Sequence, residues 1–332
     1  MPAKTAEKKL LLPTIAILLA LSLLAIIPIL HHEAPVFISL GYDCRGSLPL
    51  SSGFAAFSYG EVAVYSPKGK LVLDEKLAVS PELCTSNGDI FAAVSSGCVR
   101  LYSSKGFLGE IPESGEILSL AATGNYIVAS RLCADYACCV TVYQGLTPVF
   151  ERFIAAGACI SAAEAGGTLF LALDCGDSSQ LLLLDSKGSE IARLEFPDKI
   201  ETLHRLDNAV CAEFSDLLRF IGTGGEVQGE YDETFSSVRA FDGVLCALVP
   251  GGAVALNAHG EPVGMTETSG NVPRSFGEGK YPALILGEEV TVFNKKMEYK
   301  YTIKNKYVPQ NVMTYRDGAV LVWPCAAEIH RK

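Results

Sequence analysis

The sequence predicts an all-β protein, a single β-propeller preceded by one N-terminal transmembrane helix. Two observations lead to this fold class. Strand-length apolar segments recur about every 38 residues from residue 36 onward, and an uncharged apolar run over residues 10–30 precedes them. A repeat of this length with three or four short strands is typical of one propeller blade. We therefore expect a cytoplasmic tail (1–9), a transmembrane helix (10–30), a linker (31–35) and a propeller ectodomain (36–328).

Composition excludes two classes of protein. Of the 332 residues, 49% are hydrophobic and 19% are charged, which excludes a disordered chain and allows a large core. The formal net charge of −10 argues against a nucleic-acid partner, since such proteins need basic surfaces to replace the phosphate counterions.

The apolar run over residues 10–30 is 21 residues long, which as a helix spans about 30 Å, the thickness of the bilayer interior. A cleaved signal peptide is the alternative, but its apolar region is shorter and ends in small residues, whereas here His32 and Pro35 surround Ala34. Lys4, Lys8 and Lys9 precede the run, and the first Lys or Arg after it is Arg45. We expect an uncleaved, single-pass anchor in the cell membrane with a cytoplasmic N-terminus and an extracytoplasmic propeller.

The repeats form two series of apolar strands. In the first, Glu61–Tyr65 and Glu289–Phe293 are 228 residues apart, or six periods of 38, and five similar segments lie between them. Glycines follow most members and are expected to supply the positive φ of hairpin turns; they are Gly69, Gly106, Gly188, Gly224 and Gly260. In the second series, interpreted as the inner strands, the first apolar residues are 54, 90, 126, 169, 209, 244, 281 and 319.

Eight inner strands against seven strands of the next type predict how the ring closes. The last blade would start with Gly318–Trp323 as its inner strand, and the unpaired strand Val36–Leu40 would complete it. Closure of this kind removes an exposed sheet edge. We expect eight blades, with seven as the alternative. Pro282 lies inside one expected inner strand, where it would remove a hydrogen-bond donor from the sheet.

Two repeat segments carry a resemblance to a known family. In each segment a leucine ends an apolar strand and a turn sequence follows it. The turn sequence is Asp-Ser-Lys-Gly in Leu184–Gly188 and Asn-Ala-His-Gly in Leu256–Gly260. These segments are similar to the loose repeats of the eight-bladed quinoprotein-dehydrogenase-like (PQQ-like repeat) propellers. That superfamily includes enzymes with a quinone cofactor and non-enzymatic scaffolds. The tryptophan docking pattern of the enzymes is missing, since Trp323 is the only tryptophan, so the resemblance implies the scaffold branch and no cofactor.

The eleven cysteines predict disulfides, because disulfides persist outside the cytoplasm. Cys133 could bridge Cys138 or Cys139 across a hairpin, and Cys159 lies close to Cys175 if Ala165 pairs with Thr168. Cys44 and Cys325 lie near the two chain ends and could lock the ring. Inert thiols and a metal site at residues 133, 138 and 139 are the alternatives.

The remaining candidate site is a lysine-rich segment that contains Lys295, Lys296, Lys300, Lys304 and Lys306. It could bind an anionic partner or lipid headgroups, or it could be an outer strand whose lysines prevent edge pairing. No motif of a catalytic, metal or cofactor site occurs. The sequence thus predicts a scaffold for other envelope or membrane proteins. The alternative is an extracytoplasmic hydrolase or oxidoreductase, which would place acids, His or Arg together at the central channel.

Overall fold

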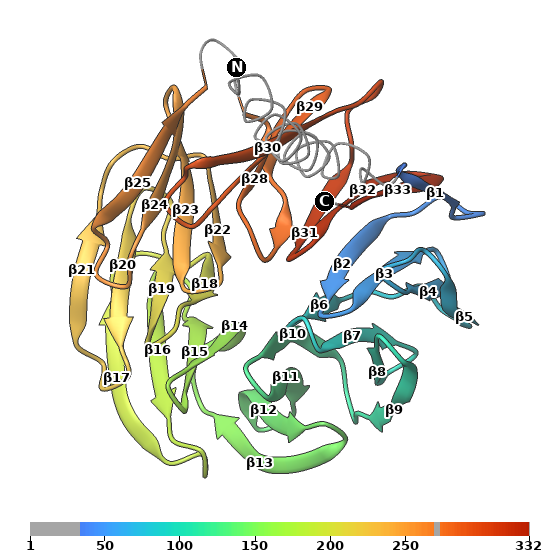
Figure 1. Ribbon diagram of the computed structural model, residues 1–332. Helices are drawn as coiled ribbons and strands as arrows, with labels where there is room; N and C mark the ends of the chain where they lie inside the picture. The colour runs from blue at the N-terminus through green and yellow to red at the C-terminus, as the bar shows by residue number, and fades with distance from the viewer. Residues whose placement is uncertain (1–33, 269–272, 332) are drawn as a thin grey trace, which may run out of the picture.

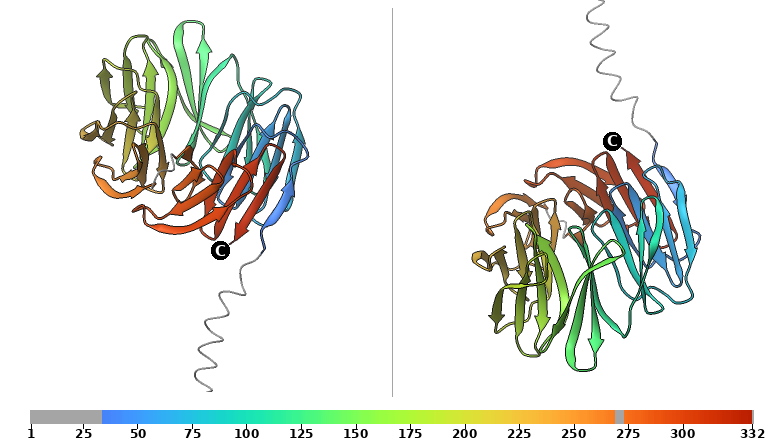
Figure 2. Two further views of the ribbon diagram at one scale, coloured as in Figure 1. Left: turned by 90° about the horizontal axis from the view of Figure 1, so that it is seen from above. Right: turned by 90° about the horizontal axis from the view of Figure 1, so that it is seen from below.

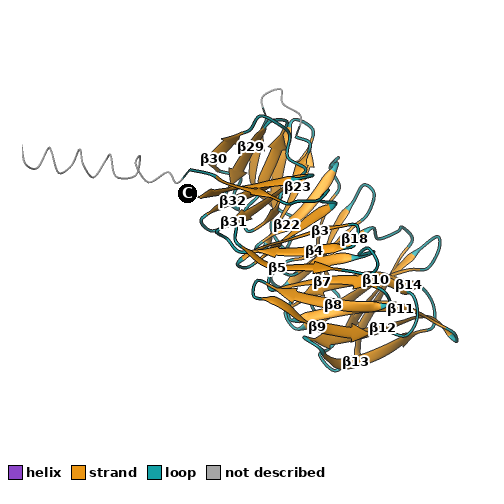
Figure 3. Ribbon diagram, turned by 90° about the vertical axis from the view of Figure 1, so that its right-hand side faces the viewer, coloured by secondary structure: helices purple, strands orange, loops and turns teal. Residues whose placement is uncertain are grey.

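The structure, a computed structural model, describes residues 34–268 and 273–331, and these residues form an eight-bladed β-propeller without helices. The blades are antiparallel sheets arranged around a central axis (Figure 1). Strands cross the thickness of the ring, so that turns lie on its two faces (Figure 3). No helix that could cross a membrane occurs in the described residues, and the predicted helix at 10–30 lies outside them.

Each blade has four strands, and blades are numbered here in chain order. Blade 1 contains β2 (Gly46–Leu50), β3 (Gly53–Ser58), β4 (Glu61–Tyr65) and β5 (Leu71–Lys76). Blade 2 contains β6 (Cys84–Ser86), β7 (Ile90–Ser95), β8 (Cys98–Ser103) and β9 (Gly106–Pro112). Blade 3 contains β10 (Ile117–Thr123), β11 (Tyr126–Cys133), β12 (Tyr136–Gln144) and β13 (Thr147–Ile154). Blade 4 contains β14 (Ala158–Ala165), β15 (Thr168–Asp174), β16 (Ser179–Leu184) and β17 (Glu190–Phe196).

The second half of the ring follows the same order until the last blade. Blade 5 contains β18 (Thr202–Arg205), β19 (Ala209–Glu213), β20 (Leu218–Gly222) and β21 (Val227–Tyr231). Blade 6 contains β22 (Ser237–Phe241), β23 (Val244–Val249), β24 (Gly252–Leu256) and β25 (Pro262–Glu267). Blade 7 contains β26 (Ser275–Phe276), β28 (Ala283–Leu286), β29 (Glu289–Phe293) and β30 (Tyr299–Lys304). Blade 8 contains β31 (Asn311–Tyr315), β32 (Gly318–Trp323), β33 (Ala326–Arg331) and the N-terminal β1 (Val36–Ser39).

The N-terminal strand closes the ring, as the sequence predicts. β1 pairs antiparallel with β33, with Val36 opposite Ile329 and Ser39 opposite Ala326. The first residue of β1 and the last residues of β33 therefore lie side by side (Figure 2). The amide of Leu40 also donates to the carbonyl of Cys325 over 3.0 Å. The propeller thus extends to Arg331, three residues beyond the predicted boundary at 328.

The predicted inner strands are in fact the second strands of their blades. The first strands, from β2 to β31, contact one another around the axis and are the innermost. Gly318–Trp323 is accordingly the second strand of blade 8, and β1 is its fourth. The second and third strands are buried on both faces and have continuous apolar sequences, whereas an inner strand such as β6, Cys-Thr-Ser, is short and half polar.

Eight hydrophobic clusters form the core of the described residues, one between each pair of neighbouring blades. The cluster between blades 8 and 1 contains Ile38 and Leu40 from the N-terminal segment together with Val320 and Ile329. Because every blade contributes both of its faces, removal of one strand exposes apolar surface on its neighbours.

Blade 7 departs from the regular pattern in its first half. Its inner strand β26 has two residues, and the following strand β27 (Glu278–Gly279) pairs in parallel with β31 of blade 8. Pro282 immediately precedes β28, and its carbonyl accepts a hydrogen bond from the amide of Phe293 over 2.8 Å. The proline therefore stands at the start of a strand, where the missing donor is tolerated.

The turn between the third and fourth strands explains the repeat motif. In blade 4 the Asp185 carboxylate accepts hydrogen bonds from the amides of Lys187 and Ser189, both over 2.8 Å, and these bonds lower the pKa of Asp185. Asn257 in blade 6 accepts from His259 and Glu261 in the same way. Gly188 and Gly260 have φ values of 81° and 76°, as expected; in blade 5 this position is Gly225, not Gly224.

Candidate functional site

A cavity of about 1160 Å³ occupies the axis of the ring and opens on one face. Seven blades contribute residues at the junction of their first and second strands; blade 4 does not. We call this face the mouth face. The turns between the third and fourth strands lie on the same face, because strands alternate in direction within an antiparallel sheet. The end of β33 also lines the cavity, so the paired start of β1 at Val36 lies on the mouth face as well.

The cavity is rich in positive charge although the chain is acidic. Its lining contains the cations Lys68, Arg205, Lys280, Arg316 and Arg331, but only two acids, Asp242 and Asp317. Lys68, Arg205, Lys280 and Arg316 are exposed. Clefts that gather one sign of charge focus the electric field and attract ligands of opposite charge.

Several of these charges have no partner in the part of the chain that the structure describes. Lys68, Lys280 and Arg316 form no ion pair with it. By contrast, Arg205 Nη2 lies 3.7 Å from Glu164 Oε2, and Asp242 Oδ2 lies 3.0 Å from Lys295 Nζ. One of the two acids is therefore already neutralised by a lysine, which leaves the mouth with a clear excess of cations.

Burial shifts the pKa of two groups that line the cavity. It lowers the pKa of His330, because removal from water disfavours the charged imidazolium, and it raises the pKa of Tyr315. His330 Nε2 lies 3.1 Å from Glu328 Oε1 but lacks hydrogen-bond geometry, and burial raises the pKa of Glu328. The enzyme alternative requires acids, His or Arg at the central channel, and the cavity lining contains His330, two aspartates and three arginines. Lys and Arg outnumber the acids in this lining.

The predicted lysine segment lies on the outer edge of blade 7. Lys300 and Lys304 are on the edge strand β30, Lys295 and Lys296 are in the preceding turn, and Lys306 follows the strand. Lys304 pairs with Glu289 over 3.2 Å, and Lys300 Nζ lies 3.6 Å from the ring centre of Tyr281. The segment is thus an outer strand, and its binding of a partner stays a prediction.

All eleven cysteines lie within the described residues, and there they are free thiols with no disulfide between them. Cys133 pairs with Tyr136, whereas Cys139 pairs with Arg131. Cys138 is therefore two residues, or about 6.6 Å, further along the partner strand than the residue opposite Cys133, too far for a bridge without backbone movement. This register does not support the predicted hairpin bridge.

The other two predicted bridges are absent for different reasons. Ala165 pairs with Thr168 as expected, but a bulge between Cys159 and Ser161 shifts the register, so that Cys159 lies opposite Leu173. Cys44 does come close to the end of the chain, since its amide donates to the carbonyl of Pro324 over 2.5 Å. Its thiol donates instead to the carbonyl of Gly46 over 3.0 Å, and burial raises its pKa.

Sequence patterns alone did not identify the cations of the mouth. Lys280 lies three residues before the second strand of blade 7, and Arg316 lies two residues before that of blade 8. Comparison of the residues at this position in every repeat is the sequence signal that could have found them. They are separated by 36 residues in sequence, and only the closed ring places them around one opening.

No family model matches this chain, and no curated protein is similar to it by sequence. Solved structures show the fold. The computationally designed Ika8 protein is 12% identical with a TM-score of 0.66, over 89% of this chain and 99% of that chain. BamB from Moraxella catarrhalis is 12% identical with a TM-score of 0.55, over 91% and 99% of the two chains. AztD from Citrobacter koseri is 12% identical with a TM-score of 0.57, over 88% and 90%. Similarity at this level establishes the propeller fold of the chain.

Proposed function

We propose that this protein is a membrane-anchored, extracytoplasmic propeller that serves as a protein–protein interaction scaffold in a cell-envelope complex. The observation that carries the proposal is the open mouth, which turns and strand ends from seven blades build on a closed ring. Turns held by a rigid framework form a broad surface whose shape is set before binding, so little conformational entropy is lost on association. The resemblance to scaffold propellers and the structural similarity to BamB are consistent with this role.

The position of the N-terminal segment supports a membrane-facing scaffold. Val36 lies on the mouth face, and only residues 31–35 separate it from the end of the predicted anchor. Five extended residues span at most about 17 Å. An anchor at residues 10–30 would therefore hold the mouth face close to the bilayer, and the partner would be a membrane protein or a protein bound near the membrane surface.

Site-specific photo-crosslinking in intact membranes tests the proposal. A crosslinking amino acid at Asp317, on the mouth, is expected to trap a discrete protein adduct that mass spectrometry identifies. The matched control places the same amino acid at Val227, which is 51% exposed on the outer strand β21. Equal, diffuse labelling from both positions, or no adduct at Asp317, would contradict a scaffold that works through its mouth.

A further inference from the structure

The charge of the mouth opposes the charge of the whole molecule. The chain has a formal net charge of −10, yet five Lys or Arg and two Asp line the cavity. No carboxylate of the described chain forms an ion pair with Lys68, Lys280 or Arg316. Their side chains are free to pair with carboxylates brought by another molecule.

The distribution of the cations around the ring sets the shape of the ligand. Lys68 belongs to blade 1, Arg205 to blade 5, Lys280 to the part of blade 7 next to blade 8, and Arg316 to blade 8. Blades 1 and 5 lie opposite each other in a ring of eight. Arg205 already pairs with Glu164. The three cations without an ion pair lie on the consecutive blades 7, 8 and 1, so a chain that carries several carboxylates can pair with them along this arc of the rim.

The hollow shape of the mouth distinguishes a polypeptide ligand from a lipid surface. The lining residues enclose a cavity of about 1160 Å³ at the mouth-face ends of the first strands, such as Leu50 and Thr123. A flat layer of headgroups contacts only the rim, whereas a loop or chain end enters.

We propose that the mouth binds an acidic polypeptide segment of the partner, with Lys68, Lys280 and Arg316 pairing with its carboxylates. This inference rests on the proposed scaffold function and names the chemistry of the partner. Binding is electrostatic at the rim, so it weakens as salt screens the charges.

The test uses the full chain in detergent and a fluorescently labelled hexaglutamate peptide, with binding followed by fluorescence anisotropy. Saturable binding is expected at about 0.05 M salt and strong weakening at about 0.3 M. The double variant K280E/R316E is expected to bind the peptide at least about tenfold more weakly. The control K105E/K187E changes the net charge equally, in exposed turns of the same face that do not line the cavity, and should bind within about twofold of the native chain.

Other outcomes overturn the inference. Equal losses in both double variants would show attraction to overall charge and not to the mouth. Binding of tripolyphosphate but not of hexaglutamate, abolished by K280E/R316E, would identify a phosphate site. Binding only to vesicles that contain anionic lipid would identify a headgroup surface. If any of these occurs while Asp317 still crosslinks a protein in membranes, the scaffold proposal stands and only the acidic segment is wrong.

Discussion

At the scale of single residues, the tight turns decide how closely one blade packs against the next. Gly260 has a φ of 76°, and a Cβ there would lie 2.9 Å from two ring atoms of Phe220, a fully buried side chain in blade 5. The turn of blade 6 therefore packs directly on the blade before it. Gly251, in another turn of blade 6, has a φ of 84°, but no atom lies within 4 Å of the position that a Cβ would occupy.

These two glycines separate backbone strain from packing. Gly251→Ala should cost only the strain of a left-handed residue, about 1–2 kcal/mol. Gly260→Ala adds a clash with a buried ring and should cost roughly 2–5 kcal/mol in total. The free energy of unfolding of both variants, from urea titrations, measures the difference. Equal losses would show that the contact with Phe220 relaxes at no cost.

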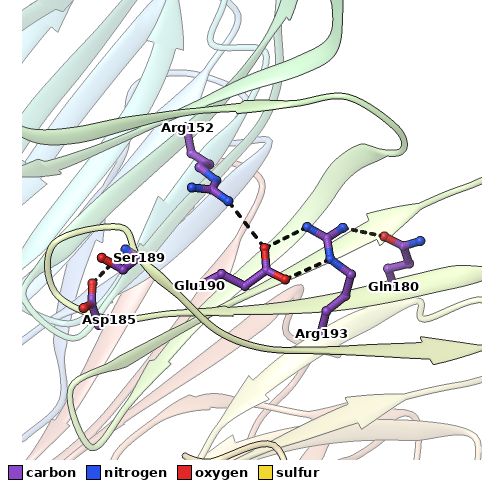
Figure 4. Close-up of polar contacts among 6 residues, drawn as sticks. All are labelled: Arg152, Gln180, Asp185, Ser189, Glu190 and Arg193. Carbon is purple, nitrogen blue, oxygen red and sulfur yellow. Dashed lines mark hydrogen bonds and ion pairs between the residues drawn. The ribbon is translucent and has the colours of Figure 1, made fainter.

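At the scale of elements, polar contacts also join neighbouring blades. Glu190, at the start of β17 in blade 4, pairs with Arg193 of its own strand over 3.0 Å and with Arg152 of β13 in blade 3 over 3.4 Å (Figure 4). Arg193 in turn donates to Gln180 over 2.8 Å. The hydrogen bond with Arg193 lowers the pKa of Glu190. Partial burial opposes this shift, and the positive charges of Arg193 and Arg152 add to it.

The lowered pKa of Glu190 predicts a small, pH-dependent stabilisation. Because the folded pKa is below the unfolded value, the contribution is present above the unfolded pKa and disappears as pH falls through the folded one. The side chains are about one third exposed, so Glu190→Gln should cost less than about 1 kcal/mol at neutral pH. Urea titrations should show this difference vanish at low pH. Glu201→Gln, which alters an exposed carboxylate in no ion pair of the described chain, should show no such trend.

The closing strand β1 gives the sharpest prediction about an element. A chain that starts at Gly41 lacks β1 and the buried side chains of Ile38 and Leu40, but keeps β2. Compared with a chain that starts at Glu33, it should lose roughly 3–6 kcal/mol of stability from those two side chains alone. A chain that starts after Leu50 would lack β2 as well, so the loss of β1 and the loss of β2 could not be separated. Equal melting temperatures for the two chains would show that β1 does not hold the ring closed.

At the scale of the whole molecule, the ring presents its mouth and the start of β1 on one face. The opposite face carries the turns between the second and third strands of each blade, because strands alternate in direction within an antiparallel sheet. A membrane anchor at residues 10–30 would thus determine which face of the propeller lies near the bilayer.

Protease accessibility tests the predicted topology. In spheroplasts, added protease should digest the propeller once its turns are cleaved, and it should spare an epitope tag placed within residues 1–9. Immunoblotting of both segments reports the result, and detergent lysis supplies the control in which both are digested. Loss of the tag from sealed spheroplasts would reverse the proposed orientation.

The repeat, the strand class and the means of closure all follow from the amino-acid sequence. These features depend on local patterns, since strands buried on both faces have continuous apolar sequences and turns with positive φ need glycine. The free strand at residue 36 and the count of eight second strands were enough to predict that the N-terminus completes the last blade.

The strand that lies at the axis of each blade, the placement of the cysteines and the gathering of charge depend instead on tertiary contacts. Some innermost strands, such as β6 and β18, are too short and too polar for periodicity to reveal them, and longer ones such as β14 have no sequence feature that marks them as the axial strand. A single bulge before Ser161 moved Cys159 out of the expected register, and such bulges leave no reliable mark in a sequence. Lys68 and Arg316 are 248 residues apart, and they line one cavity because closure of the ring joins the first blade to the last.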